Sequence, residues 1–193
     1  RQDALIGHNT DAAGFNLTLQ SAGYDPTGKL ALVLGAGGAA RAVVYALVQS
    51  GADVVVLNRT PQRAEVLARS MPGHVTACVL DSTTLSMYSC AALVVNATSV
   101  GMWPAVDYAP WPDDVPFPHN ALLCDLVYNP RRTCLVRRAL SAGARYIDGL
   151  WMLVYQGAES FRMWTGQEPD VGMMFSAADQ QLGGQGVATF NGR

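Results

Sequence analysis

The chain has a single lysine, Lys29, and only 15% of its residues are charged. Its 13 Lys and Arg residues nearly balance its 15 Asp and Glu residues, which gives a formal net charge of -2. A polyanion-binding surface needs a basic field that this balance does not supply, so we exclude nucleic acid as a partner. No apolar run reaches the roughly 18 residues that cross a bilayer, and residues 1–3 are too polar for a secretory signal. We therefore expect a cytoplasmic protein without a membrane contact.

Metal-ligand spacing is also lacking. The cysteines lie far apart and form no CxxC pair, so we expect buried free thiols: Cys78, Cys90, Cys124 and Cys134. The histidines are equally scattered and are expected on the surface or in loops: His8, His74 and His119. We assign no metal site to either residue type.

What the chain does contain is an alternation of short apolar runs with helical stretches. Residues 30–34 (LALVL) are too few for a helix and are closed by glycines, which is typical of a strand covered on both faces. The same reasoning predicts strands at 53–57, 76–80, 92–95, 121–125 and 145–147, and helices at 39–49, 61–70, near Leu85 and at 133–142. Such alternation predicts parallel pairing through right-handed crossovers. The expected fold class is α/β, a Rossmann-like doubly wound parallel sheet of about six strands with extra helices at both ends.

Other segments depart from this alternation. Residues 11–22 read as a helix before the first strand, and residues 150–165 and 169–182 as two helices after the last. Residues 102–119 carry five prolines and no clean period, which predicts a long loop at the sheet edge that follows a strand's carboxyl end. We expect Trp103 and Trp111 in this loop to pack. The length predicts one domain at 1–182, with a loose tail at 183–193.

The sequence GAGGAA at 35–40 follows the first predicted strand and opens a helix. Gly35 permits a tight turn, Gly37 lets a pyrophosphate approach the backbone, and Ala40 allows close packing of helix on strand. The helix start adds free N–H groups and a favourable dipole, whereas a glycine turn without a ligand is the alternative. The context predicts dinucleotide binding by these residues: Gly35, Ala36, Gly37, Gly38 and Ala39.

The end of the second predicted strand indicates which dinucleotide is bound. NAD sites usually place a carboxylate there to bind the ribose 2′-hydroxyl. In this chain Asn58, Arg59 and Thr60 stand at that point, and Arg63 lies one helical turn beyond. Guanidinium groups match the oxygens of a 2′-phosphate, which a carboxylate would repel. The sequence therefore predicts NADP as the cofactor, unless both arginines are simply solvated charges.

Five short motifs follow one another in order along the chain. They are NTD at 9–11, NRT at 58–60, NATSVGM at 96–102, DLVYNP at 125–130 and GLWMLVYQ at 149–156. Together they resemble the shikimate dehydrogenase family (shikimate/quinate 5-dehydrogenase), and specifically its C-terminal NADP-binding domain. The matches extend over nearly the whole chain up to Gly166, so chance likeness of a generic dinucleotide-binding domain is a poor explanation.

The resemblance implies NADP-linked reduction of 3-dehydroshikimate to shikimate in the intact enzyme. The cofactor of such a reaction delivers a hydride, while the protein aligns the ring and manages the proton on its oxygen. The family uses a Lys and Asp pair, and its Asp corresponds to Asp11, which could otherwise be a helix-capping carboxylate. Gln156 and Tyr128 correspond to positions near the substrate, although without the resemblance they would be ordinary helix and core residues. The ribose and nicotinamide end would be lined by Thr98, Ser99, Val127, Gly149 and Met152.

The family's catalytic lysine has no counterpart in this chain. Lys29 stands before the first predicted strand, roughly 15 Å from the ligand-binding end for a strand of five residues. In the family that lysine belongs to an amino-terminal substrate domain with a serine pair and an asparagine, and we expect that domain to be missing. Ala12 also replaces the family's usual Gly. We therefore expect the chain to bind NADP(H) and to be inactive unaided.

Three alternatives remain open. The chain could be a non-catalytic NADP(H)-binding module that docks on a partner through the helix with Asp11 and the last two helices. It could belong to a quinate/shikimate dehydrogenase of broader specificity, because one hydroxyl distinguishes the two rings. It could also be half of another dehydrogenase such as glutamyl-tRNA reductase, against which residues 9–11 and 152–156 speak. A homodimer is a further candidate assembly.

Overall fold

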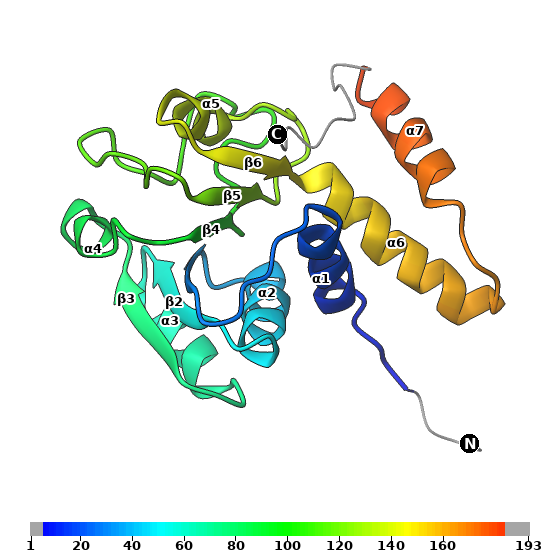
Figure 1. Cartoon of the computed structure of the whole chain (residues 1–193), viewed down its shortest axis with the longest axis horizontal. Helices are drawn as coiled ribbons and strands as arrows, with labels where there is room; N and C mark the ends of the chain where they lie inside the picture. Colours follow the sequence, from blue (N-terminus) through cyan, green and yellow to red (C-terminus); the bar gives the residue numbers. More distant parts are fainter. Residues whose placement is uncertain (1–5, 184–193) are drawn as a thin grey trace.

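The computed structural model describes residues 6–183 as a six-stranded parallel sheet with helices on both faces (Figure 1). The strand order is β3-β2-β1-β4-β5-β6, so the direction of winding reverses between β1 and β4, as in doubly wound folds. The strands are β1 Leu30–Leu34, β2 Asp53–Asn58, β3 Val75–Val79, β4 Leu93–Asn96, β5 Leu122–Asp125 and β6 Arg145–Asp148. The helices are α1 Asp11–Ser21, α2 Gly38–Gln49, α3 Pro61–Arg69, α4 Ser82–Met87, α5 Cys134–Ser141, α6 Gly149–Thr165 and α7 Val171–Gln181.

The register brings the carboxyl ends of the strands level with one another. Leu34, the last residue of β1, lies beside Leu57 of β2 and Asn96 of β4. Asn96 in turn lies beside Asp125, and Asp125 lies beside Asp148 of β6. The segments that follow these strands therefore meet along one edge of the sheet. All the motifs identified in the sequence, except the one that begins α1, start at this edge.

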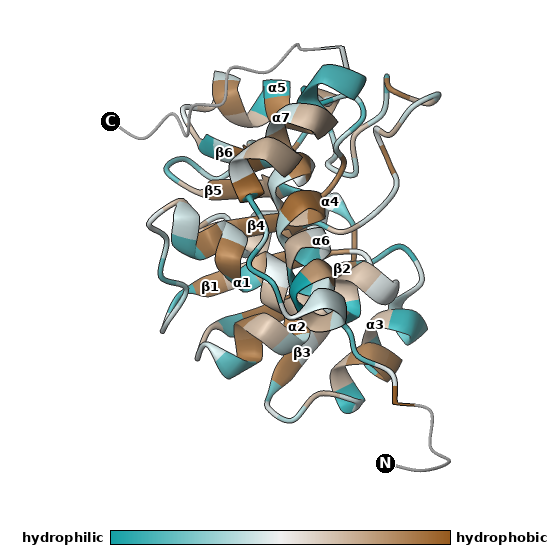
Figure 2. Cartoon of the chain, turned by 90° about the vertical axis from the view of Figure 1, so that its right-hand side faces the viewer, coloured by the Kyte–Doolittle hydropathy of each residue, from teal (hydrophilic) through white to brown (hydrophobic). Residues whose placement is uncertain are grey.

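Strand residues alternate between two hydrophobic cores. Ala31 and Val33 of β1 point into the core formed with α1, α2, α3 and α6. Leu32 and Leu34 point into the other core, with α4, α5 and part of the connection between β4 and β5. Figure 2 shows the apolar strands β4 and β5 lying between the helices. Burial on both faces explains why the strands read as continuous apolar runs.

The proline-rich connection between β4 and β5 occupies the place of a crossover helix. It begins at the carboxyl end of β4, as predicted, but it is not confined to the sheet edge. Trp111, Val115 and Phe117 are buried in the core on the α4 and α5 face, and the Trp111 indole donates to the Val115 carbonyl at 2.9 Å. Trp111 is only 3% exposed, whereas Trp103 is 66% exposed, so packing is confirmed for Trp111 and was wrong for Trp103.

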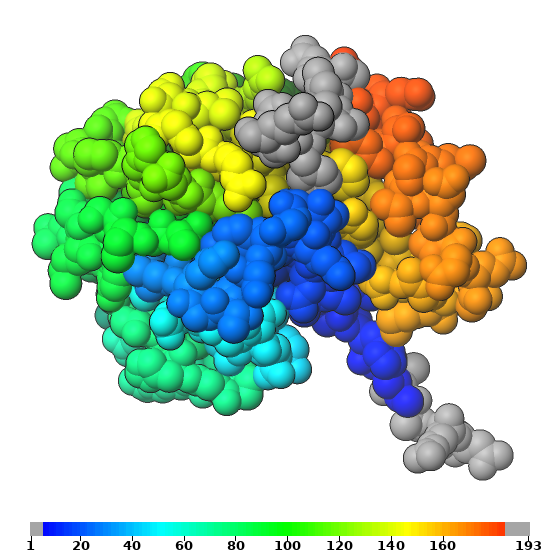
Figure 3. Space-filling model, in the orientation of Figure 1, coloured from blue at the N-terminus to red at the C-terminus, as the bar shows by residue number. Residues whose placement is uncertain are grey.

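The helices at the chain ends pack against one another. α1 crosses α6 at Gly14, where a Cβ atom would lie 2.7 Å from the Gln156 backbone nitrogen. Only glycine allows this approach, and it fixes the start of α1 beside the middle of α6. Figure 3 shows α1 against α6, with the chain ahead of α1 leading away from the body, and Figure 1 shows α7 alongside α6. This packing carries the NTD segment onto the carboxyl edge of the sheet.

Most predicted elements are confirmed to within two residues, and the cysteines are free as predicted, but their predicted burial was wrong for three of the four. Only Cys124 is buried, whereas Cys90 is exposed. Cys78 is partly exposed because β3 is an edge strand, and Cys134 is partly exposed at the first position of α5. Within residues 6–183 no helix has the length and apolar character of a membrane span. The predicted tail lies beyond Gly183, outside the described residues.

Candidate cofactor and substrate site

The glycine turn after β1 has the geometry that its sequence predicts. Gly35 has φ +107°, and a Cβ atom there would lie 3.0 Å from the Ala97 carbonyl oxygen, so the position excludes other residues. Gly37 is the N-cap of α2 and has no side chain. No atom lies within 4 Å of the position that a Cβ atom would take at Gly37 or at Gly38. Ala40 is fully buried against the strands. Open space therefore faces the free N–H groups of the first turn of α2.

A cavity of about 400 Å³ adjoins this turn on the β2 side. It is lined by Ala36, Arg41, Gln62, Arg63, Val66 and Leu67. Arg63 is exposed within it, and Arg41 reaches across to donate to the Ser70 hydroxyl at 2.9 Å. Asn58 donates to the Thr60 carbonyl at 2.8 Å and so shapes the turn on which Arg59 lies exposed, outside the cavity lining. Two guanidinium groups thus line one cavity beside the glycine turn, with a third on the adjoining turn.

A second cavity, of about 300 Å³, adjoins the other side of the glycine turn. It brings together residues from four separate parts of the chain: Asp11, Ala39, Leu126, Tyr128, Gly149, Met152, Leu153 and Gln156. Asp11, Tyr128, Gly149, Met152 and Gln156 were all predicted as site residues from sequence. Val127 is buried and does not belong to the lining of this cavity. Thr98 packs against Gly35: its methyl carbon would lie 3.1 Å from a Cβ atom at Gly35. The next residue, Ser99, is exposed.

Asp11 is the first residue of α1, and its carboxylate is available to a ligand. Thr10, not Asp11, occupies the N-cap position, so Asp11 is not the capping residue. The Asp11 backbone N–H donates to Asn9 Oδ1 at 2.8 Å, and within residues 6–183 no side chain bonds its carboxylate. Gln156 donates to the Leu153 carbonyl at 2.9 Å and accepts a long bond of 3.5 Å from the Thr10 hydroxyl. One carboxylate and one weakly held amide therefore face the same cavity.

Two family models and a curated relative match this chain. Residues 17–101 match the family model described as shikimate / quinate 5-dehydrogenase, and residues 149–174 match the shikimate 5'-dehydrogenase C-terminal domain. The shikimate dehydrogenase (NADP(+)) of Moorella thermoacetica is 44% identical over 195 residues, which cover 98% of this chain and 66% of the relative. The chain belongs to the shikimate dehydrogenase family.

Solved structures agree with this family assignment. Shikimate 5-dehydrogenase from Thermus thermophilus, in complex with NADP(H) and shikimate, matches with 42% identity and a TM-score of 0.79 over 90% of this chain and 63% of that one. The 5-ketofructose reductase of Gluconobacter sp. strain CHM43 matches with 31% identity and a TM-score of 0.81, over 94% and 66%. The chain spans only 62% to 66% of the length of the curated shikimate dehydrogenases it matches.

Sequence reasoning missed a buried polar network that joins two of the family motifs. Asp125 accepts from Asn96 Nδ2 at 2.8 Å and from the Val127 N–H at 3.1 Å through Oδ1, and from the Thr133 hydroxyl at 2.6 Å through Oδ2. The side-chain Oδ1 of Asn96 accepts from both the N–H and the hydroxyl of Thr98. This network fixes the loops that begin at the ends of β4 and β5. A polar residue ending each of two apolar runs was the available signal.

The Asp125 carboxyl predicts a pH dependence of stability. Desolvation by burial raises its pKa above the ordinary 3.8, although hydrogen bonds from Thr133, Val127 and Asn96 oppose the rise. The folded state thus holds this proton more tightly than the unfolded state, so the carboxyl's contribution to stability falls as pH rises above about 4. Asp125→Asn keeps an acceptor at Oδ1 and removes the titration. In urea titrations we expect the free energy of unfolding of the wild type, minus that of Asp125→Asn, to fall as the pH rises above about 4. A difference that grows with pH contradicts this.

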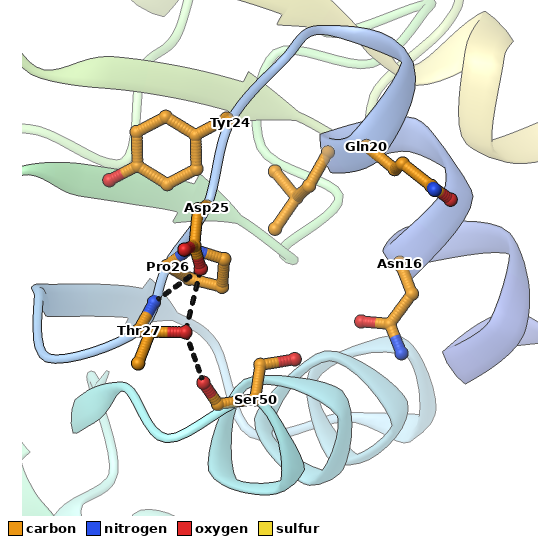
Figure 4. Close-up of a pocket in the computed structure, with 8 residues that line it drawn as sticks. Asn16, Gln20, Tyr24, Asp25, Pro26, Thr27 and Ser50 are labelled. Atoms are coloured by element: carbon orange, nitrogen blue, oxygen red, sulfur yellow. Dashed lines mark hydrogen bonds between the residues drawn. The ribbon is translucent and has the colours of Figure 1, made fainter.

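A third cavity, of about 400 Å³, lies at the opposite edge of the sheet (Figure 4). It lies between α1, the end of α2 and the turn before β1, where Thr27 bonds Asp25 and the Ser50 carbonyl. The cavity is large enough for a small ligand, but none of its lining residues belongs to a family motif. Lys29 lies at this same edge, with Nζ 4.2 Å from the centre of the Tyr24 ring. Lys29 therefore lies at the amino end of β1, away from the carboxyl edge of the sheet, as predicted.

Proposed function

We propose that this chain binds NADP(H) along the carboxyl edge of its sheet. The observation that carries the proposal is that the glycine turn contributes to two cavities, Ala36 to one and Ala39 to the other. A dinucleotide needs this arrangement, because its two nucleosides lie on either side of the pyrophosphate. The helix start between the cavities offers the N–H groups and the dipole for the pyrophosphate.

The cavity on the β2 side would receive the adenosine end. Arg63 and Arg41 line it, and Arg59 lies on the adjacent turn with Asn58 and Thr60. Three guanidinium groups without a nearby carboxylate on the strand end favour a ribose that carries a 2′-phosphate. Relatives named as NADP(+) enzymes support the same choice.

The second cavity, which is lined by Asp11 and by residues of α6, would receive the nicotinamide and the substrate. Gly149 and Met152 would flank the nicotinamide, with Thr98, Ser99 and Val127 supporting its ribose side. Asp11, Tyr128 and Gln156 would face the substrate, a ring that carries hydroxyl groups. The bound cofactor supplies a hydride, and the residues of this chain orient the ring and handle the proton. Asp11 is suited to hold or accept a proton near the reacting oxygen, and the Gln156 amide is suited to bind a ring hydroxyl.

We further propose that the intact enzyme reduces 3-dehydroshikimate to shikimate reversibly, and that this chain alone does not. Its single lysine stands at the opposite edge of the sheet, so no lysine side chain is available beside Asp11. Quinate as an additional substrate remains the second candidate, because the matching family model covers both shikimate and quinate enzymes.

The test is calorimetric titration of the chain with NADPH and with NADH. We expect clear preference for NADPH, because each charge-assisted hydrogen bond to the 2′-phosphate contributes about 1.5–3 kcal/mol, or roughly tenfold or more in affinity. The double variant Arg59→Ala/Arg63→Ala should weaken NADPH binding by about tenfold or more and leave NADH binding nearly unchanged. Arg69→Ala is the matched control, since Arg69 is exposed at the far end of α3, where it pairs with Glu65.

Equal binding of NADH and NADPH by the unaltered chain would overturn the cofactor assignment. The same preparation, mixed with NADPH and 3-dehydroshikimate, should oxidise NADPH no faster than a blank without protein. Turnover above that blank would contradict the proposal that the chain lacks an essential group. Retained binding in the Arg59 and Arg63 variant would assign the 2′-phosphate to other residues, with Arg41 the next to test.

A further inference from the structure

A buried arginine joins the loop after β5 to the end of β6 and to α7, close to the cavity that contains Asp11. Arg131 is 8% exposed and follows β5. Its Nε and Nη2 donate to Asp148 Oδ2 at 3.0 and 2.6 Å, and its Nη1 donates to Asp179. Asp148 ends β6, and Asp179 lies on α7. None of these three residues belongs to the lining of the cavity that contains Asp11.

The two carboxylates have different tasks. Asp148 is the N-cap of α6, because its Oδ1 accepts from the Leu150 N–H at 3.1 Å while Oδ2 holds Arg131. Asp179 connects the same guanidinium to α7. Phe175, one turn earlier on α7, lies 5.4 Å from the Arg131 guanidinium and stacks on Trp151 of α6 with centroids 4.2 Å apart. The corner where α6 begins is thus held by both ionic and aromatic contacts from α7.

This corner lies next to two walls of the cavity. Arg131 comes three residues after Tyr128, and Asp148 immediately precedes Gly149; both Tyr128 and Gly149 line the cavity. The Arg131–Asp148 bond therefore ties the loop that carries Tyr128 to the helix that carries Met152. A displacement of α7 is transmitted to both walls through one guanidinium.

We propose that Arg131, Asp148 and Asp179 form a brace through which α7 positions the nicotinamide end of the cavity. The proposal rests on the proposed function above. Arg131 is a positioning residue and does not touch the ligand. α7, which contributes no residue to the cavity lining, then sets how well the cavity receives the nicotinamide.

The charge count singles out the informative substitution. Removing Arg131 leaves two carboxylates without their cation, and removing Asp148 also removes the N-cap of α6, so either change would confuse folding with positioning. Removing the charge of Asp179, whose side chain is 18% exposed, leaves the Arg131–Asp148 pair complete. Asp179→Asn therefore loosens α7 from the corner while the pair beneath it stays neutralised.

The experiment compares two ligands on the full chain. NADPH spans both cavities, whereas adenosine 2′,5′-bisphosphate carries the adenosine and the 2′-phosphate without the nicotinamide. For Asp179→Asn we expect the NADPH dissociation constant to rise by about threefold to thirtyfold, with no change for adenosine 2′,5′-bisphosphate. Asp179→Glu should restore part of the NADPH affinity. Glu168→Gln is the matched control, because it breaks an exposed ion pair with Arg162 at the far end of α6.

The outcomes separate the brace from the proposed function. Unchanged NADPH affinity in Asp179→Asn overturns the brace. Equal weakening of both ligands also overturns it, because that result indicates general loss of structure. Failure of the unaltered chain to bind adenosine 2′,5′-bisphosphate overturns the proposed function, and the brace with it.

Discussion

Replacing Gly149 by alanine is expected to cause the largest loss of stability among single methyl additions on α6. A Cβ atom at this position would lie 2.2 Å from the Leu126 carbonyl oxygen and 2.9 Å from the Val127 carbonyl carbon. Both contacts are with backbone, so α6 must move away from the end of β5. Overpacking of this kind costs about 1–3 kcal/mol and sometimes more. We expect about 3 kcal/mol, which for a domain of this size lowers Tm by about 10 °C in circular dichroism melts.

The matched control lies two turns further along the same helix. A Cβ atom at Gly157 would meet only the terminal methyl of Met174, at 3.4 Å, and that side chain is flexible. Gly157→Ala should therefore keep or raise stability, by up to about 1 kcal/mol, because alanine favours helix over glycine. If the Gly149→Ala protein had the same Tm as the wild type, α6 would not start against the loop after β5. It would also remove the reason for placing Met152 and Gln156 beside Asp11.

The fold was predictable because the local signals agree with one another. Most strands are apolar runs of a few residues, although β6 contains two charged residues, and a helix follows every strand except β4. Parallel pairing and a doubly wound sheet then follow from this alternation and from right-handed crossovers. The connection from β4 to β5 was harder, since prolines predict a loop but carry no period that identifies a buried face. Trp111, Val115 and Phe117 are buried by tertiary contacts that no local pattern reveals.

The residues around the cavity that contains Asp11 were predictable through the family resemblance of their motifs, of which all but the one at Asp11 start at a strand's carboxyl end. Asp11, Tyr128, Met152 and Gln156 meet in one cavity although they lie far apart in sequence. Arg41 was missed because it stands inside the first turn of α2, where a charged residue reads as an exposed helix position. The role of Arg131 was missed because it depends on Asp179, 48 residues away on a helix with no motif of its own. Long-range ion pairs leave no periodic trace in a sequence.

Alanine at Gly37 and at Gly35 should separate ligand binding from folding. Gly37 has φ -90° and ψ -166°, which alanine adopts without strain, and no atom lies within 4 Å of the added methyl. Stability should therefore stay unchanged. The methyl would, however, occupy the space over the first turn of α2 through which a pyrophosphate reaches the N–H groups. Losing one or two such hydrogen bonds corresponds to about tenfold to hundredfold weaker NADPH binding in calorimetric titrations.

Gly35→Ala should instead lose both properties. Its φ of +107° is unfavourable for any residue with a Cβ atom, and the added methyl would press on the Ala97 carbonyl oxygen at 3.0 Å. The turn would open, and Tm would fall. The first turn of α2 would then no longer be positioned to bind the pyrophosphate. If Gly37→Ala bound NADPH as tightly as the wild type while Gly35→Ala did not, the glycine turn would serve the packing of β1 against β4 alone. The pyrophosphate would then have to lie elsewhere, because no ligand group can approach that backbone past a methyl without losing contact.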